Sequence, residues 1–311
     1  MTAKNKTLPK LSVVVCTYNR RKYIGQNLDS FIHQTAHNSD FEIVIVNNNS
    51  PDDTHQICEK FMETYPEINI TYVTENKQGL TNARNRGIQE SKSALIAFID
   101  DDAFVRKEYC TETIQFFKSH PKVTVVGGKI IPVYESGSEP AWMSPYLLTL
   151  MAAQDLGDRI KPFSRNKFPI GANMIFRATI FKEVGVFNPD LGRKGDSLEG
   201  GEEKDIIFKI RSTNKSILYC PTIVVDHIIS EIREDMSYIK KMGFGIGISE
   251  ITRVKQAGVM GVVIKIFQEA FKWAASFILF FKYLITGNSI KGITLLKFRY
   301  WVLEGLLKGK T

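Results

Sequence analysis

Short apolar runs alternate with segments of helical periodicity through the first hundred residues, and this alternation limits the fold more than any other feature of the sequence. The apolar runs are 11–16, 41–46, 70–73 and 94–100, and the helical segments between them are 21–35, 54–65 and 80–91. Continuous apolar, β-branched runs predict strands buried on both faces, and short connections through helices predict parallel pairing. The sequence therefore predicts an α/β fold, a doubly wound and mostly parallel sheet with flanking helices.

The pattern changes after a further predicted helix at 109–119. Strand signals and helical segments then follow in a less regular order, at 123–135, 173–185, 202–214 and 216–227. The segment 188–201 holds four glycines and a proline, so we expect a long flexible loop there. From Asp235 onward the chain is predicted to be helical. We therefore expect three parts, with the bounds 1–122, 123–235 and 236–311.

The net charge of +8 is unevenly distributed. From Met236 to the end, twelve Lys and Arg stand against three Glu, which gives +9, whereas the first 235 residues carry −1. The basic part is also rich in Phe, Trp, Ile and Leu, which favours an anionic membrane surface as partner over nucleic acid. No nucleic-acid-binding motif accompanies it.

The same region is predicted to lie on a membrane without crossing it. Its uncharged run Trp273–Phe281 has nine residues, well short of the roughly 20 that span a bilayer. Polar side chains recur at helical steps and predict a narrow polar stripe on an otherwise apolar amphipathic helix; they are Lys265, Gln268, Glu269, Lys272 and Ser276. We expect the apolar side to face lipid, with lysines near the phosphates. The alternative is a helix packed on the catalytic domain.

Cysteine usage indicates a reducing compartment. Cys16, Cys58, Cys110 and Cys220 lie far apart without a CxxC pair, which argues against a disulfide framework or a zinc site. The first ten residues are polar and basic, and nothing there is typical of a signal peptide. We therefore expect a cytoplasmic protein.

Three adjacent carboxylates, Asp100, Asp101 and Asp102, follow the fourth predicted strand in AFIDDDAFV. Ligands of open α/β sheets bind at the carboxyl ends of strands, and like charges this close together favour a cation. On an extended backbone Asp100 and Asp102 point to one side and Asp101 to the other. Oxygen ligands of this kind suit Mg²⁺ or Mn²⁺, which in turn hold phosphates. The alternative is a solvated acidic loop.

Other polar residues are predicted at the same edge of the sheet. The first strand ends in CTYNR, where Tyr18 offers a ring face to a base and Thr17 and Asn19 offer hydrogen bonds. The glycine pattern of a Rossmann dinucleotide site is absent there. Arg84 and Arg86 stand two apart on a predicted helix, so at most one faces the site, and Arg84 would clamp a diphosphate. An ordinary turn and a surface arginine are the alternatives.

Acidic residues open the predicted helix that follows the glycine-rich loop. Glu202, Glu203 and Asp205 would complement the helix dipole, or one of them would act as a general base delivered by a mobile loop. His227 ends a predicted strand and is either structural or functional.

Together and in this order, these segments resemble glycosyltransferase family 2, inverting enzymes of the GT-A fold, over about residues 11–233. The segments that carry the resemblance are SVVVCTYNR, FEIVIVNNNSPDDT, GLTNARNRGI, AFIDDDAFV, FPIGANMIFR, LEGGEEKDIIFKIR and VVDH. The resemblance implies a nucleotide-sugar-binding half at 1–122 and an acceptor-binding half with the catalytic base at 123–235.

The resemblance also implies residue roles. Tyr18 should stack on the nucleobase, Asn48 should lie at the base edge, and Arg84 should contact base or diphosphate. Asp100 should contact donor ribose or metal, and Asp102 should ligate the metal. The resemblance implies that His227 meets the metal or the diphosphate. We also expect Thr17, Asn19 and Asp101 to contact the donor and Asn173 to contact the acceptor. The ring of Trp142 could contact the flat face of an acceptor sugar, or it could pack in a core.

Two positions depart from the family pattern. Asn47 stands where an aspartate is usual, which leaves the nucleotide open, and Glu203 stands where aspartate is common. Either Glu203 or Glu202 could be the base, and position favours Glu203. We expect an inverting, metal-dependent enzyme that moves a sugar, with a UDP-sugar favoured, to a glycan or lipid-linked acceptor in surface-polysaccharide or glycolipid assembly. A nucleotidyltransferase and an inactive membrane-bound sugar-binding protein are the alternatives.

Overall fold

The structure, a computed structural model, describes residues 8–193, 200–256 and 258–308. The chain forms two compact units. Unit 1 comprises the described residues of Met1–Pro132, Gln154–Gly195 and Glu202–Ile228, and unit 2 comprises those of Val133–Ala153, Asp196–Gly201 and Ile229–Thr311. Part of the expected flexible loop, 194–199, lies outside the described residues.

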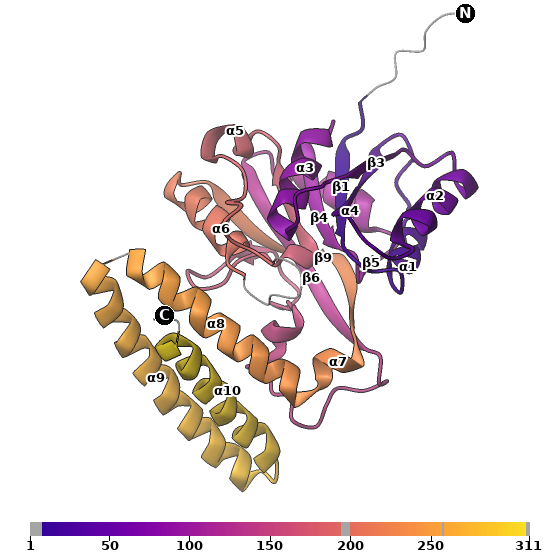
Figure 1. Cartoon of the computed structure of the whole chain (residues 1–311). Helices are drawn as coiled ribbons and strands as arrows, with labels where there is room; N and C mark the ends of the chain where they lie inside the picture. Colours follow the sequence, from indigo (N-terminus) through magenta and orange to yellow (C-terminus); the bar gives the residue numbers. More distant parts are fainter. Residues whose placement is uncertain (1–7, 194–199, 257, 309–311) are drawn as a thin grey trace, which may run out of the picture. The chain divides into compact units, whose positions relative to one another are not determined.

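A mixed sheet organises the strands, in the order β3-β2-β1-β4-β8-β6-β9-β5, with β7 added on β9 (Figure 1). The strands are β1 (Leu11–Thr17), β2 (Phe41–Asn47), β3 (Ile70–Thr74), β4 (Leu95–Asp100), β5 (Ala103–Val105), β6 (Val123–Tyr134), β7 (Lys161–Pro162), β8 (Met174–Arg177) and β9 (Ser216–Ile229). Strands β3, β2, β1 and β4 run parallel. Antiparallel pairing begins at β8, which joins β4 to β6. The predicted α/β fold is confirmed, but the sheet is mixed, since only its β3-β2-β1-β4 part is parallel.

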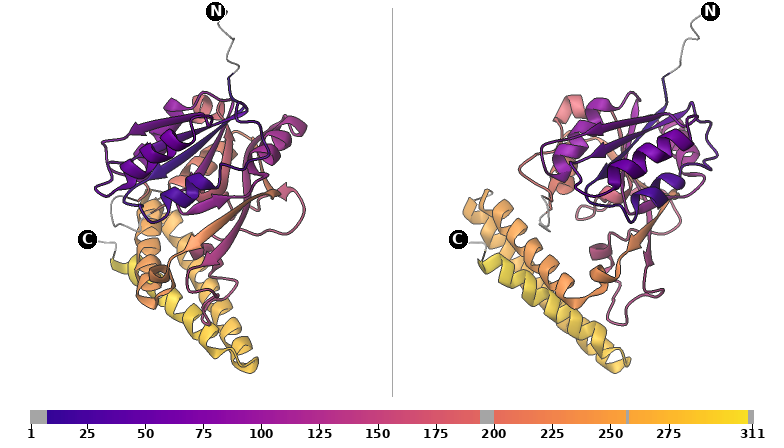
Figure 2. Two further views of the ribbon diagram at one scale, coloured as in Figure 1. Left: turned by 90° about the vertical axis from the view of Figure 1, so that its right-hand side faces the viewer. Right: turned by 45° about the vertical axis from the view of Figure 1, so that its right-hand side comes forward.

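Helices cover both faces of this sheet in unit 1, as Figure 2 shows. Alternate residues of β1 point to opposite faces, so Val13 and Val15 belong to one apolar core and Val14 to the other. The first core is closed by α1 (Ile24–Asp29), α2 (Thr54–Thr64) and α4 (Tyr109–Ser119). The second is closed by α3 (Leu80–Glu90), α5 (Ile180–Val184) and α6 (Glu202–Ser212).

Two local features differ from the sequence prediction. The helix expected over 21–35 is only Ile24–Asp29, and no side chain caps its start at Tyr23. The short strand β5 was not predicted, because three residues directly after an acidic turn give no periodic signal. It pairs antiparallel with β9 and sets Ala103 opposite His227.

Unit 2 is built around three long helices, α8 (Met236–Gln256), α9 (Gly258–Ile285) and α10 (Ser289–Lys308), with the short α7 (Glu231–Glu234) before them. Helix α10 packs against both α8 and α9. At the crossing of α8 and α10, a Cβ atom on Gly247 would lie 2.7 Å from the Leu306 nitrogen and 2.8 Å from Gly305 Cα. Glycine is therefore required there for the two backbones to approach.

No helix within the described ranges is both long enough and apolar enough to span a membrane. The core of unit 2 gathers apolar residues of α8 and α10 together with a segment that contains the short 3₁₀ turn η1 (Leu148–Met151), and Leu279 and Tyr283 of α9 pack against it. A second 3₁₀ turn, η2 (Gly171–Asn173), belongs to unit 1 and precedes β8.

Candidate active site

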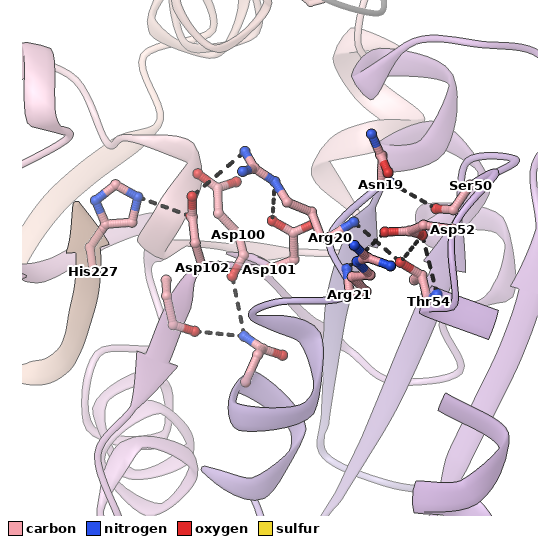
Figure 3. A network of polar contacts seen from close by, with 12 residues as sticks. Asn19, Arg20, Arg21, Ser50, Asp52, Thr54, Asp100, Asp101, Asp102 and His227 are labelled. Atoms are coloured by element: carbon pink, nitrogen blue, oxygen red, sulfur yellow. Dashed lines mark hydrogen bonds and ion pairs between the residues drawn. The ribbon is translucent and has the colours of Figure 1, made fainter. Parts of the chain in front are cut away.

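The site lies in unit 1 at the edge where β1, β2 and β4 end. Residues Cys16 and Asp100 are register partners on β1 and β4, so the turns that follow these strands start side by side. The turn after β1 is tied to the turn after β2, as Figure 3 shows. The ties are Asn19 N to Ser50 Oγ at 3.0 Å, Arg20 N to Thr54 Oγ1 at 3.2 Å, and Arg21 N to Asp52 Oδ2 at 3.0 Å.

Asp100, Asp102 and His227 form the candidate metal centre. One ligand atom from each of these residues lies within 4.8 Å of the other two. The Nε2 atom of His227 is 3.1 Å from Asp102 Oδ1, and both side chains are almost fully buried. Pairing of β5 with β9 brings the histidine here from 125 positions along the chain. Two carboxylates and an imidazole suit Mn²⁺, and they suit Mg²⁺ less because Mg²⁺ prefers an all-oxygen environment.

A buried asparagine fixes the backbone of this acidic turn. Asn27 of α1 is fully buried, and its Nδ2 donates to the carbonyl oxygens of Asp100, at 3.2 Å, and Ala103, at 2.6 Å. A single amide thus holds both ends of the turn that carries the three aspartates.

Arg20 supplies a positive charge to the cluster and was not among the site residues predicted from the sequence. Its Nε lies 3.4 Å from Asp101 Oδ1 and its Nη2 lies 3.7 Å from Asp102 Oδ2 (Figure 3). Burial raises the pKa of Asp101 to about 7, with Asp102 adding to the shift and Arg20 opposing it. The adjacency of β1 and β4 was the available signal, because it places the residues after each strand close together.

Arg84 of α3 joins the acidic cluster to the two glutamates of α6. Its Nη1 donates to Glu202 Oε1 at 2.9 Å and its Nη2 to Glu203 Oε1 at 3.3 Å, while Asp100 Oδ1 lies 3.5 Å from Nη2. The side chain is only 2% exposed, and burial disfavours its charge, but the three carboxylates outweigh burial and raise the pKa of Arg84. As expected, Arg86 does not join the site; it pairs with Glu90 on the same helix.

The two glutamates differ in their surroundings. Glu202 is 5% exposed at the side chain, and its Oε2 has no hydrogen-bond partner among the described residues. Glu203 is 20% exposed and accepts a hydrogen bond from the backbone N–H of Gly171 at 2.8 Å. Burial raises the pKa of Glu203 to about 7, with Arg84 opposing and Glu202 and Asp100 adding to the shift. Glu203 is thus the glutamate that combines access with a pKa suited to proton transfer.

The residues predicted to contact the nucleotide differ in their exposure and in their hydrogen bonds. Tyr18 is half-buried and Asn19 is exposed, with a left-handed φ of 55°. Thr17 is buried, and its carbonyl accepts from the backbone N–H of Asn48. Asn48 itself donates to the carbonyls of Glu75 and Lys77 and accepts from Gly79 N–H. Its amide is therefore occupied in holding the 75–79 loop, which argues against the expected base-edge contact.

The two expected acceptor residues have structural positions instead. Asn173 is fully buried, donates to the carbonyls of Lys129 and Ile223, and lies 3.2 Å from the Tyr109 hydroxyl. Its hydrogen-bonding groups link neighbouring strands, so the expected acceptor contact is not supported. Trp142 is 9% exposed in the core of unit 2, which corresponds to the core-packing alternative.

Comparison with known sequences identifies relatives of the chain. Residues 12–185, more than half of the chain, match the family described as Glycosyl transferase family 2. A glucosyl-dolichyl phosphate glucuronosyltransferase from Haloferax volcanii is 24% identical over 78% of this chain and 76% of its own length. Glycosyltransferase AglE from the same organism is 27% identical over 61% of this chain and 60% of its own. The Staphylococcus aureus poly(ribitol-phosphate) β-N-acetylglucosaminyltransferase TarS is 26% identical over 58% of this chain and 30% of its own length.

Solved structures share the fold. The mannosyltransferase PcManGT from Pyrobaculum calidifontis, in complex with GDP-Man and Mn²⁺, superposes with a TM-score of 0.66 at 16% identity, over 99% of this chain and 89% of that one. TarS from S. aureus in complex with UDP-GlcNAc superposes with a TM-score of 0.56 at 19% identity, over 78% of this chain and 66% of that one. At these identities the likeness supports the GT-A fold, which confirms that expectation.

Proposed function

The chain belongs to glycosyl transferase family 2, and on that premise we propose that it transfers a sugar from a nucleoside-diphosphate-sugar to a hydroxyl of its acceptor. The observation that carries the proposal is the meeting, at one sheet edge, of a metal-ligand set, a buried arginine and a half-buried glutamate with a raised pKa. A UDP-sugar is the favoured donor. The enzyme inverts the anomeric configuration.

The acidic cluster would hold a divalent cation, which would supply positive charge to the donor diphosphate. Asp102, Asp100 and His227 would hold Mn²⁺ or Mg²⁺, with Mn²⁺ favoured by the imidazole. When bound, the cation neutralises negative charge that develops on the departing nucleoside diphosphate. Arg20 adds a positive charge at the same place, since its guanidinium already contacts two of the aspartates. Arg20 and Arg84 are the protein's own cations toward the phosphates.

Glu203 is proposed as the general base. It accepts the proton of the acceptor hydroxyl as that oxygen attacks the anomeric carbon on the side opposite the diphosphate. The bond to the diphosphate breaks as the new glycosidic bond forms, and the configuration inverts. The Gly171 N–H holds one carboxylate oxygen of Glu203 and fixes the direction of the other. Glu202 is the closer partner of Arg84, so its proposed role is to hold that arginine in place.

The proposed acceptor is a glycan or a lipid-linked glycan, in surface-polysaccharide or glycolipid assembly. The names of two relatives support this, because one acts on glucosyl-dolichyl phosphate and another on poly(ribitol-phosphate). An acceptor anchored in a membrane requires the enzyme to work at its surface. We therefore place it peripherally at the inner face of the cell membrane, where anionic lipid attracts basic segments.

A thermal-shift screen tests the donor site. Nucleoside diphosphates and nucleotide-sugars are added with and without Mn²⁺, to the native chain, to Asp102→Ala and, as a matched control, to Asp53→Ala, whose carboxyl is 66% exposed. We expect a Mn²⁺-dependent rise in melting temperature with one base, absent only in Asp102→Ala. Donor hydrolysis with Mn²⁺ then separates a transferase from an inactive binding protein. Stabilisation by nucleoside triphosphates alone would favour a nucleotidyltransferase instead.

A further inference from the structure

Helix α9 exposes an apolar surface along its whole length. Within this helix, all of which the structure describes, the exposed polar side chains are Gln268, Lys282 and, at 40%, Lys272. The most exposed large side chains, each at least 70% accessible, are Val259, Met260, Phe267, Phe271, Ile278 and Ile285. Contiguous apolar surface of this extent is rare on soluble monomers and marks a site of association.

Three of the five residues of the polar stripe are buried, which corrects part of the sequence expectation. Lys265, Glu269 and Ser276 are 6%, 7% and 4% exposed. The Nζ of Lys265 lies 2.9 Å from Glu250 Oε2 on α8 and 3.0 Å from Glu269 Oε1, and Lys272 Nζ lies 2.7 Å from the same Glu269 oxygen. The expected contact of Lys265 with lipid phosphates is therefore wrong, because an internal ion-pair network uses this lysine.

The network explains the direction in which α9 faces. A buried lysine or glutamate without a partner would be strongly unfavourable, so the pair of Lys265 with Glu250 ties the polar side of α9 to α8. The side that remains for the exterior is apolar. The orientation is the reverse of that of an ordinary surface helix, which turns its apolar side inward.

The net charge of this region indicates which kind of partner binds the exposed surface of α9. The part of the chain from Met236 onward carries +9, and exposed lysines stand on all three long helices, at Lys240, Lys241, Lys282 and Lys297. A second copy docked on the same surface would bring two such charges together. A bilayer with anionic lipids offers both an apolar interior and a complementary charge.

We infer that the exposed face of α9 docks on an anionic lipid bilayer, with the helix lying in the plane of the interface. The 28 residues of α9 would extend about 42 Å along the surface at 1.5 Å per residue. In such helices the apolar side enters the boundary between headgroups and acyl chains while flanking lysines remain at the phosphates. The inference rests on the proposed function in one respect, that a lipid-linked acceptor would be met at this surface.

Flotation of the full chain with liposomes tests the docking surface. The vesicles are phosphatidylcholine alone or mixed with phosphatidylglycerol. The test variant is Phe267→Gln/Phe271→Gln/Ile278→Gln, and the control is Ile160→Gln/Val186→Gln/Ile232→Gln, which changes exposed apolar residues outside α9. We expect the native chain and the control to float with the mixed vesicles, and the α9 variant to lose binding by about tenfold or more.

Several results would overturn the inference. Equal flotation of the α9 variant and the control would remove α9 as the docking surface, and equal flotation with neutral vesicles would remove the role of anionic lipid. Absence of flotation, with a dimer in sedimentation velocity that the α9 variant abolishes, would assign the surface to a second copy. The Mn²⁺-dependent thermal shift with nucleotide is measured on the same samples. It should be unchanged in the α9 variant, so failure of docking and failure of the proposed donor site are read separately.

Discussion

The rate of transfer should depend on the protonation of Glu203. A general base must be unprotonated to act, so the rate should rise with pH through its pKa. Burial and the neighbouring carboxylates raise that pKa to about 7. About a tenth of the carboxyl is then ionised at about pH 6 and about nine-tenths at about pH 8, which predicts a change in rate of roughly tenfold across this range.

The assay is transfer under single-turnover conditions at saturating donor and Mn²⁺, compared for the native chain, Glu203→Gln and Glu202→Gln. Saturation matters because burial also raises the pKa of Asp101, beside the metal-ligand set, to about 7, so metal binding itself should weaken at low pH. Glu203→Gln should retain donor binding, lose transfer by a factor on the order of 10² or more, and lose the rising limb of the pH profile. Glu202→Gln should reduce the rate of transfer less and should keep the rising limb of the pH profile.

The reverse ranking would refute the assignment. If Glu202→Gln abolished the pH-dependent limb while Glu203→Gln kept it, the base would be Glu202, and the hydrogen bond from Gly171 to Glu203 would be only structural. A native profile that is flat between about pH 6 and about pH 8 would show that proton abstraction does not limit transfer in this range.

Three further perturbations probe the parts around the base. Asp102→Ala should abolish Mn²⁺-dependent nucleotide binding in calorimetry without loss of fold, and unchanged affinity would remove it from the metal set. Arg20→Ala should tighten the binding of Mn²⁺ without nucleotide, because it removes a competing cation from two aspartates, and should lower the stability of the metal-free protein by about 1 kcal/mol. The control is Arg21→Ala, because the exposed Arg21 guanidinium pairs outside the cluster. Equal Mn²⁺ affinity in the two variants would contradict the argument. Gly171→Ala should cost about 1–3 kcal/mol by chemical denaturation and reduce transfer, because its Cβ would clash with the buried arginine and the proposed base. The matched change Gly25→Ala should be tolerated, since its Cβ would meet a neighbour at an ordinary 3.6 Å.

The sequence by itself determined the parallel part of the sheet and the place of the acidic turn. Alternate residues of an apolar strand must face two helical layers, so runs such as 11–16 and 94–100 predict strands buried on both faces, and the helices between them predict parallel pairing. Once β4 was predicted, Asp100 to Asp102 had to lie at its carboxyl end. The same local argument predicted that only one of Arg84 and Arg86 could face the site, because positions two apart on a helix point in different directions.

The tertiary structure alone decided which partner each polar group meets. Arg84 contacts Glu202, which is 118 positions away in the sequence, and His227 contacts Asp102, which is 125 positions away. No local sequence pattern predicts contacts between residues so far apart in the chain. Asn48 and Asn173 had the right polarity for ligand contacts, but the loops and strands around them use their hydrogen bonds.

Helix α9 illustrates the same limit. Its periodicity predicts two unlike faces, but periodicity does not say which face turns toward the rest of the protein. That choice depends on partners elsewhere in the chain, here on Glu250 of α8, which pairs with Lys265 and keeps this lysine inside. Which side of an amphipathic helix is exposed is therefore a property of packing between elements, while the existence of two sides is a property of the sequence.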